Sequence, residues 1–127
     1  MGRFDSVDEF ASLDRDACNA TAVKACQLAV DASGLEEEPA VAALHQVKAG
    51  RTDHDGSRSM RELSRKLDEA AWSAQEAGDE RRYDSLFRQS RTASALAFAL
   101  SNEPYEAIYE AAYAVGSPED LIVRLGT

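Results

Sequence analysis

A run of small apolar residues in the C-terminal half of the chain most strongly limits how it can fold. The eight residues from Ala93 to Leu100 read Ala-Ser-Ala-Leu-Ala-Phe-Ala-Leu, with no ionisable group and with apolar side chains on almost every side. A helix that is hydrophobic all round is buried among other helices, and small side chains let those neighbours approach closely. We therefore expect an all-α fold with this segment as its central helix.

Capping residues and glycines divide the chain into seven predicted helices. Ser6 with Glu9, and Ser59 with Glu62, have the spacing of capping boxes at helix starts. Glycine follows four of the predicted helices, where a left-handed residue is favoured. The predicted helices span residues 6–13, 16–33, 36–50, 59–78, 81–101, 103–116 and 117–125.

The length of 127 residues fits one domain, residues 1–127, with a core large enough to fold without disulfides or metal. We predict a single compact bundle of about five to seven helices. Stacked helical hairpins are an alternative arrangement of the same elements.

Periodicity also predicts which side chains of these helices face inward. Val41, Leu44 and Val47 form the expected inner face of the third helix, and Trp72 is expected to be a partly buried packing residue of the fourth. Cys18 and Cys26 lie eight residues apart in one predicted helix. That spacing separates them by about 12 Å, too far for a disulfide, so we expect two buried free thiols.

The chain is acidic, with a formal net charge of −9. Residues 1–57 contribute −6 and residues 92–127 contribute −4, whereas residues 58–91 contribute +1. A negative surface repels nucleic acid and anionic lipid, so neither is an expected partner, and it favours a basic protein. No apolar run approaches the roughly 20 residues that span a bilayer. The N-terminus lacks the pattern of a secretory signal, so we expect a cytoplasmic protein.

The sequence contains no recognisable nucleophile–base pair, phosphate loop or cluster of metal ligands. One stretch approaches calcium-loop spacing if Arg51 is counted as position one. Positions three, five, six, seven, nine and twelve are then Asp53, Asp55, Gly56, Ser57, Ser59 and Glu62. Arginine at position one cannot coordinate a cation, and turn and capping chemistry explains the other residues. We therefore predict no enzyme activity, no cofactor and no metal.

The candidate functional residues are instead those suited to binding another protein. Glu36, Glu37 and Glu38 open the third helix and, with Asp53 and Asp55, bracket it with negative charge, which would attract a basic partner. Tyrosines recur at every fourth residue of the sixth helix and so form one stripe on its surface. Tyrosine combines an apolar ring with a polar tip, which suits either the edge of a core or a contact surface. From this stripe we select Tyr105 and Tyr109 as binding anchors.

The order of the helices resembles a known class of small proteins. An amphipathic helix with cysteines (Ala17 to Ala32) precedes a short helix that ends in Lys48-Ala49-Gly50-Arg51. A long polar-faced helix, an alanine-rich helix (Arg91 to Ala99) and a helix rich in tyrosine and alanine (Tyr109 to Ala114) follow. This layout resembles the helical immunity proteins encoded beside bacterial polymorphic toxins. The resemblance implies occlusion of a toxin's active surface without chemistry, and it assigns no individual site residue.

The leading hypothesis is thus a non-enzymatic protein-binding domain that acts through an acidic surface. An immunity protein is a special case of such a domain. A small-molecule- or metal-binding helical bundle is one alternative. The site of such a bundle would assemble only in the folded chain, from residues that are distant in sequence. A self-associating structural domain, with the tyrosine stripe at its seam, is the other.

Overall fold

Six helices make up the part of the chain that the computed structural model describes, residues 13–126. They are α1 (Arg15–Ser33), α2 (Glu38–Lys48), α3 (His54–Glu76), α4 (Glu80–Leu100), α5 (Pro104–Val115) and α6 (Pro118–Leu125). No strand occurs among these described residues, so the predicted all-α bundle is confirmed. The helix predicted over residues 6–13 lies outside the described residues, apart from Leu13.

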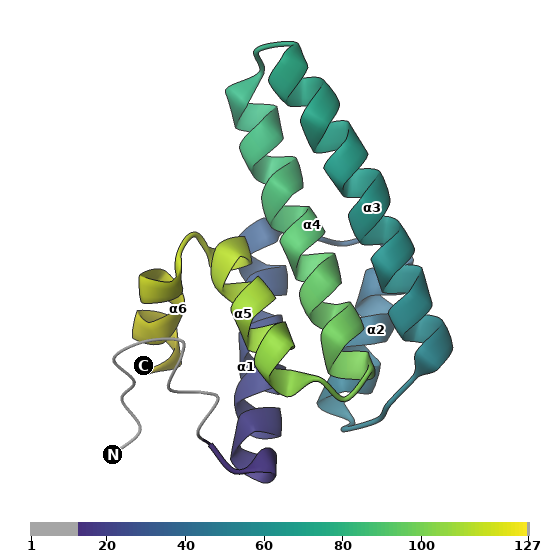
Figure 1. Cartoon of the computed structure of the whole chain (residues 1–127), viewed down its shortest axis with the longest axis vertical. Helices are drawn as coiled ribbons and strands as arrows, with labels where there is room; N and C mark the ends of the chain where they lie inside the picture. The colour runs from purple at the N-terminus through teal and green to yellow at the C-terminus, as the bar shows by residue number, and fades with distance from the viewer. Residues whose placement is uncertain (1–12, 127) are drawn as a thin grey trace.

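The helices are arranged around a long antiparallel hairpin formed by α3 and α4 (Figure 1). α4 is the central element, because it contacts α1, α2, α3 and α5. α5 also packs against α1, and α6 contacts both α5 and α1. These neighbours surround the C-terminal half of α4, and the turn between α3 and α4 projects beyond them (Figure 1). The protein is therefore a bundle from which one end of a helical hairpin protrudes.

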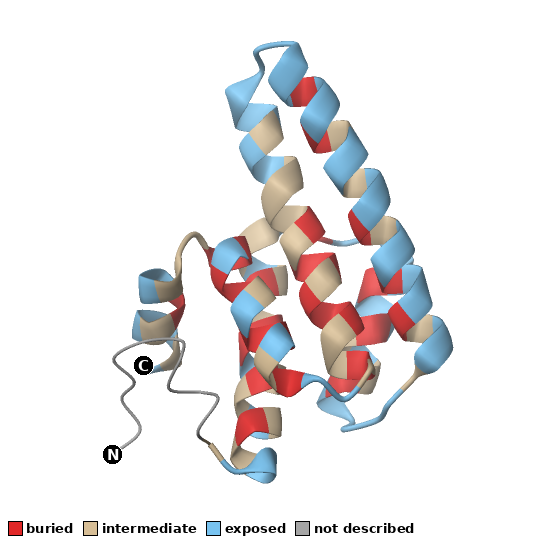
Figure 2. Ribbon diagram, viewed as in Figure 1, coloured by how far each residue is buried: buried red, intermediate tan, exposed pale blue. Residues whose placement is uncertain are grey.

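The predicted central segment is buried, and alanine dominates the core around it (Figure 2). Leu96 and Leu100 of this segment have no exposed surface. Eight alanines are equally inaccessible: Ala25, Ala29, Ala93, Ala95, Ala107, Ala111, Ala112 and Ala114. Side chains this small let helices pack at the short end of the usual 8–10 Å between axes. The core is accordingly held together by close backbone approach more than by large side chains.

Both cysteines of α1 are buried free thiols, as the sequence predicts. Cys26 is fully enclosed, and burial raises the pKa of its thiol to about 12. Burial also raises the pKa of Cys18. Thiolate is the reactive form of cysteine, so neither side chain is activated as a nucleophile in the folded protein.

Two expectations about packing are wrong. Val41 is 57% exposed, because the face of α2 that contacts the bundle is formed by Ala40, Ala43 and Val47. Trp72 is 63% exposed, because it lies on α3 near the projecting turn, where α4 is the only one of the six described helices placed to cover it.

The start of α3 also differs from the prediction. The helix begins at His54, five residues before the expected cap at Ser59. Asp53 is the N-cap, and its Oδ1 accepts a hydrogen bond of 3.0 Å from the backbone N–H of Gly56. Ser59 is exposed within the helix, and Glu62 forms an ion pair with Arg65 at 2.5 Å. The calcium-like spacing therefore belongs to the first two turns of a helix, in which successive side chains point in different directions.

We expect Asp53→Ala to lower the free energy of unfolding by about 1 kcal/mol, because the first turn of α3 loses its side-chain cap. Ser59→Ala is the matched control and should change stability by less than about 0.5 kcal/mol, as expected for an exposed position. Urea denaturation followed by circular dichroism measures both values. Equal losses of unfolding free energy in the two variants would contradict the assignment of Asp53 as the cap.

Hydroxyl groups are buried along the seam between α3 and α4. Ser57 Oγ donates to the carbonyl oxygen of Ala97 at 2.8 Å. Ser64 and Ser90 share a hydrogen bond of 3.1 Å between their Oγ atoms. On the other side of α4, Thr92 Oγ1 donates to the carbonyl oxygen of Ala29 in α1 at 3.2 Å. These hydrogen bonds join different helices, so they form only at the observed alignment of the helices.

Candidate functional site

The predicted acidic residues fall into two separate groups. Glu36, Glu37 and Glu38 are exposed at the start of α2, and Asp53 and Asp55 lie at the start of α3. α2 separates the two groups, and its 11 residues extend over about 16 Å. Asp53 serves as a helix cap, and the side chain of Asp55 is 94% exposed. These residues contribute to the negative potential of the molecule and do not converge on one point.

A shallow groove lies beside the first of these groups, between the start of α2 and the first half of α3. Its lining mixes both signs of charge around Pro39 and Leu63: Glu37 and Glu62 are acidic, and Arg58, Ser59 and Lys66 complete the wall. The basic side chains of α3 thus interrupt the acidic edge that the sequence suggests along α2. The groove offers no uniform charge to a partner.

The predicted tyrosine stripe divides into buried and exposed parts. Tyr105 is half-buried and packs against the core. Tyr109 is 43% exposed and Tyr113 is 36% exposed. Their ring centroids lie 5.5 Å apart with an angle of 60° between the ring planes, the edge-to-face arrangement that aromatic pairs prefer. The exposed pair is therefore Tyr109 with Tyr113, whereas Tyr105 holds α5 to the bundle.

The two tyrosine hydroxyls interact with each other. A hydrogen bond with Tyr109, together with the charge that Tyr109 carries when ionised, contributes most to raising the pKa of Tyr113 above its ordinary value. Partial desolvation and the carboxylates of Glu119 and Glu110 raise this pKa further. The Tyr113 phenol therefore stays protonated and neutral near pH 7.

Arg91 of α4 joins three helices beside this pair. Its guanidinium binds Glu110 of α5 at 2.5 Å and Asp68 of α3 at 3.1 Å. The same group lies over the ring of Phe87, 5.7 Å from the ring centroid. The Arg91 side chain is 22% exposed and that of Glu110 is 17% exposed, so solvent screens this ion pair less than a fully exposed one. The Arg91 Nε is buried without a hydrogen-bond partner among the described residues.

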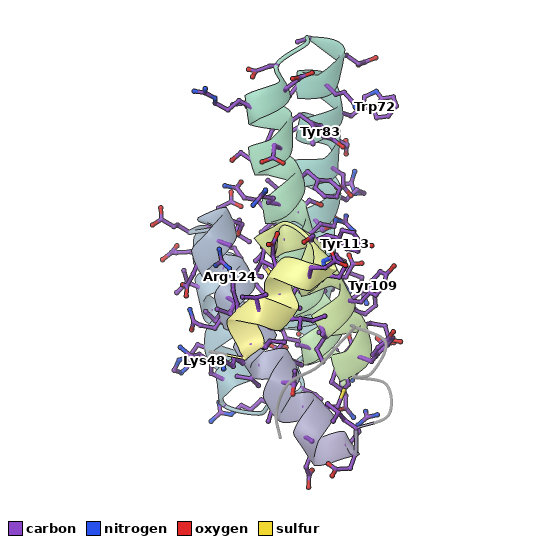
Figure 3. All side chains as sticks on the ribbon, turned by 90° about the vertical axis from the view of Figure 1, so that its left-hand side faces the viewer. Lys48, Trp72, Tyr83, Tyr109, Tyr113 and Arg124 are labelled. Atoms are coloured by element: carbon purple, nitrogen blue, oxygen red, sulfur yellow. The ribbon has the colours of Figure 1, made fainter. Side chains whose placement is uncertain are left out.

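Trp72 extends the same surface along the hairpin. It lies one helical turn beyond Asp68 on α3, and therefore on the same side of that helix. Trp72, Tyr109 and Tyr113 project to the same side of the molecule, as Figure 3 shows. We call Trp72, Phe87, Arg91, Tyr109 and Tyr113, with Asp68 and Glu110, the aromatic face.

Sequence reasoning finds only part of this face. Tyr109 follows from the tyrosine stripe, but Trp72 was expected to be packed and Tyr113 was not selected. The spacing of four between Phe87 and Arg91, and between Asp68 and Trp72, is visible in the sequence. What joins the two pairs is the alignment of α3 with α4, which places Asp68 beside Arg91. No local pattern in the sequence specifies that alignment.

The described part of the chain offers less support for a metal site, a small-molecule pocket or a membrane-spanning helix. Residues 13–126 contain no group of three or more His, Cys, Asp or Glu side chains placed to hold a metal ion. A crevice of about 110 Å³ between α1, the end of α2 and the start of α5 is lined by one charged side chain, Arg51. Among the described helices, none has the length and apolar character needed to cross a membrane.

Comparison of the chain with known protein families, with curated proteins and with solved structures finds no match.

Proposed function

We propose that this chain is a non-enzymatic protein-binding domain whose partner is a basic protein. The observation that supports this most directly is the aromatic face, on which three exposed aromatic side chains flank a partly buried arginine–carboxylate network. Tryptophan, tyrosine and arginine are the residues most enriched among those that dominate binding energy at protein interfaces.

The charge of the molecule supports a basic partner. Its formal net charge of −9 produces a long-range attraction for positively charged proteins, which raises their rate of association. The carboxylates at the starts of α2 and α3 contribute to this attraction at a distance, including Glu37 and Asp55. In this proposal, the aromatic face supplies contact energy and the dispersed acidic residues supply steering.

Within this class, we propose that the partner is a toxin whose active surface is covered by the bound domain. The support is the resemblance in helix layout to immunity proteins of polymorphic toxin systems. Expressing the captured partner alone should arrest growth of the host cell, and co-expressing this chain should restore growth. A partner that is harmless when expressed alone would exclude this more specific role while leaving the binding function intact.

The binding function is tested by purifying the tagged protein from a lysate of its native cell at low and moderate salt. We expect to recover one basic protein, with less recovered at moderate salt because ions screen the steering charges. With that partner purified, Trp72→Ala should raise the dissociation constant at least tenfold, which corresponds to a loss of about 1.4 kcal/mol of binding free energy. Isothermal titration calorimetry measures this change.

Val41→Ala is the control, because Val41 is similarly exposed but lies on α2, outside the aromatic face. It should leave the dissociation constant within about twofold, as expected for a contact outside the region that dominates binding. A partner sensitive to Val41→Ala and insensitive to Trp72→Ala would overturn this choice of surface. Sizing chromatography of the free protein tests the alternative that the domain self-associates. A dimer that Tyr109→Ala dissociates would show that the aromatic face binds a second copy of this chain.

A further inference from the structure

The aromatic face already contains one arginine-binding arrangement, built from its own residues. The Arg91 guanidinium lies over the Phe87 ring and pairs with two carboxylates, Glu110 at 2.5 Å and Asp68 at 3.1 Å. An aromatic ring with nearby carboxylates suits guanidinium, which stacks through its planar surface and donates hydrogen bonds from its edge. Arg91 thus shows which chemistry this surface accommodates.

A second set of the same groups lies next to it, at the junction of α5 and α6. The Tyr109 and Tyr113 rings are exposed, and Glu119 is exposed in the first turn of α6. Glu119 forms no ion pair with another described residue, and its charge reaches the Tyr113 hydroxyl. This set differs from the Arg91 site in one respect: the ion pairs and the cation–π contact among the described residues do not include Tyr109, Tyr113 or Glu119.

The basic residues nearby are already engaged. Arg91 is held by Asp68 and Glu110. Arg88 pairs with Asp84 at 3.1 Å on its own helix. Its Nη1 would lie 3.9 Å from a Cβ placed on Gly116, so Arg88 borders the α5–α6 turn. The pairing with Asp84 offsets its repulsion of an incoming cation.

We propose that Tyr109, Tyr113 and Glu119 form a subsite for an arginine side chain of the partner protein. The guanidinium would stack on an exposed tyrosine ring and donate hydrogen bonds to the Glu119 carboxylate, reproducing the environment of Arg91. This inference rests on the proposed function and adds to it the chemical identity of the partner's anchoring side chain. Arginine is favoured over lysine because its planar group combines stacking with paired hydrogen bonds.

The test uses a synthetic peptide of alternating glycine and arginine, blocked at both ends, and a second peptide with citrulline in place of arginine. Citrulline keeps the planar shape and removes the charge. The tyrosine ring resonances of the protein are followed by NMR during each titration. We expect saturable shifts of Tyr109 and Tyr113 with the arginine peptide, and binding at least tenfold weaker with the citrulline peptide. Glu119→Gln should weaken binding of the arginine peptide about three- to tenfold, as expected for loss of one charge-assisted hydrogen bond.

Glu38→Gln is the matched control, because Glu38 is likewise an exposed carboxylate in the first turn of a proline-started helix. Equal weakening by Glu38→Gln and Glu119→Gln would show that the peptide responds only to overall negative charge, and would overturn the subsite. Equal binding of the two peptides would overturn it as well. Neither result bears on the loss of partner binding in Trp72→Ala, so the subsite and the binding function fail independently.

Discussion

Replacement of Ala111 by leucine is expected to lower the free energy of unfolding by about 3 kcal/mol, the upper end of the usual cost of overpacking a core. Ala111 has no exposed surface on α5, which packs against both α1 and α4. A leucine there has no room unless these helices move apart, and such a movement would loosen the other alanine contacts around it. Thermal and urea denaturation of the purified variant measure the loss.

Ala42→Leu provides the comparison for this substitution. Ala42 is exposed on α2, so the same change in volume meets solvent and should alter stability by less than about 0.5 kcal/mol. Leu96→Ala tests the effect of removing volume from the core. It should cost about 2–5 kcal/mol by leaving a cavity beside the C-terminal half of α4. If Ala111→Leu were tolerated as well as Ala42→Leu, close helix approach would not be what holds this core together.

Arg91→Ala is expected to cost about 2–3 kcal/mol, less than the 3–5 kcal/mol typical when one partner of a fully buried ion pair is removed. The discount reflects the partial exposure of Arg91, at 22%, and of Asp68, at 49%. The loss arises mainly because Glu110, which is only 17% exposed, is left without a positive partner. The same substitution removes the cation that lies over Phe87. Chemical denaturation with two spectroscopic probes measures the change.

Arg65→Ala is the matched control for this loss. Arg65 also pairs with two carboxylates, Glu62 and Glu69, but its side chain is 61% exposed. Exposed pairs contribute little to stability, so Arg65→Ala should cost much less than Arg91→Ala. Replacing Arg91 and Glu110 together by leucine should recover part of the stability lost in Arg91→Ala, because no unpaired charge remains. Equal costs for Arg91→Ala and Arg65→Ala would show that burial does not strengthen the Arg91 network.

The extent of each helix followed from local chemistry, because caps and glycines act over a few residues. Ser117, for example, caps α6 as predicted, and its Oγ accepts from the backbone N–H of Asp120 at 3.1 Å. The predicted start of α3 is wrong because two residues six positions apart, Asp53 and Ser59, are both plausible caps. The backbone N–H of Asp53 donates to the carbonyl oxygen of Leu100, at the end of α4, which anchors the chain six residues earlier. That contact joins residues distant in sequence and has no local signature.

The aromatic face was less predictable for the same reason. Helical spacing shows that Tyr109 and Tyr113 share a side of α5, but not whether that side is covered. Trp72 has the neighbours of a packing residue in sequence, but Ala71 and Ala74 are the buried residues of this part of α3, and Trp72 is exposed. Exposure of this kind depends on the relative lengths and alignment of several helices.

The hydroxyl seam between α3 and α4 fixes the position of Trp72 on α3 relative to Phe87 and Arg91 on α4. Sliding one helix past the other by a single turn, about 5.4 Å, would leave Ser57, Ser64 and Ser90 without their partners. Each orphaned group would cost about 1–3 kcal/mol. The alignment of the hairpin is therefore fixed, and the proposed partner would meet aromatic side chains on helices whose relative position is already set. Little backbone freedom would be lost there on complex formation, which would favour slow dissociation.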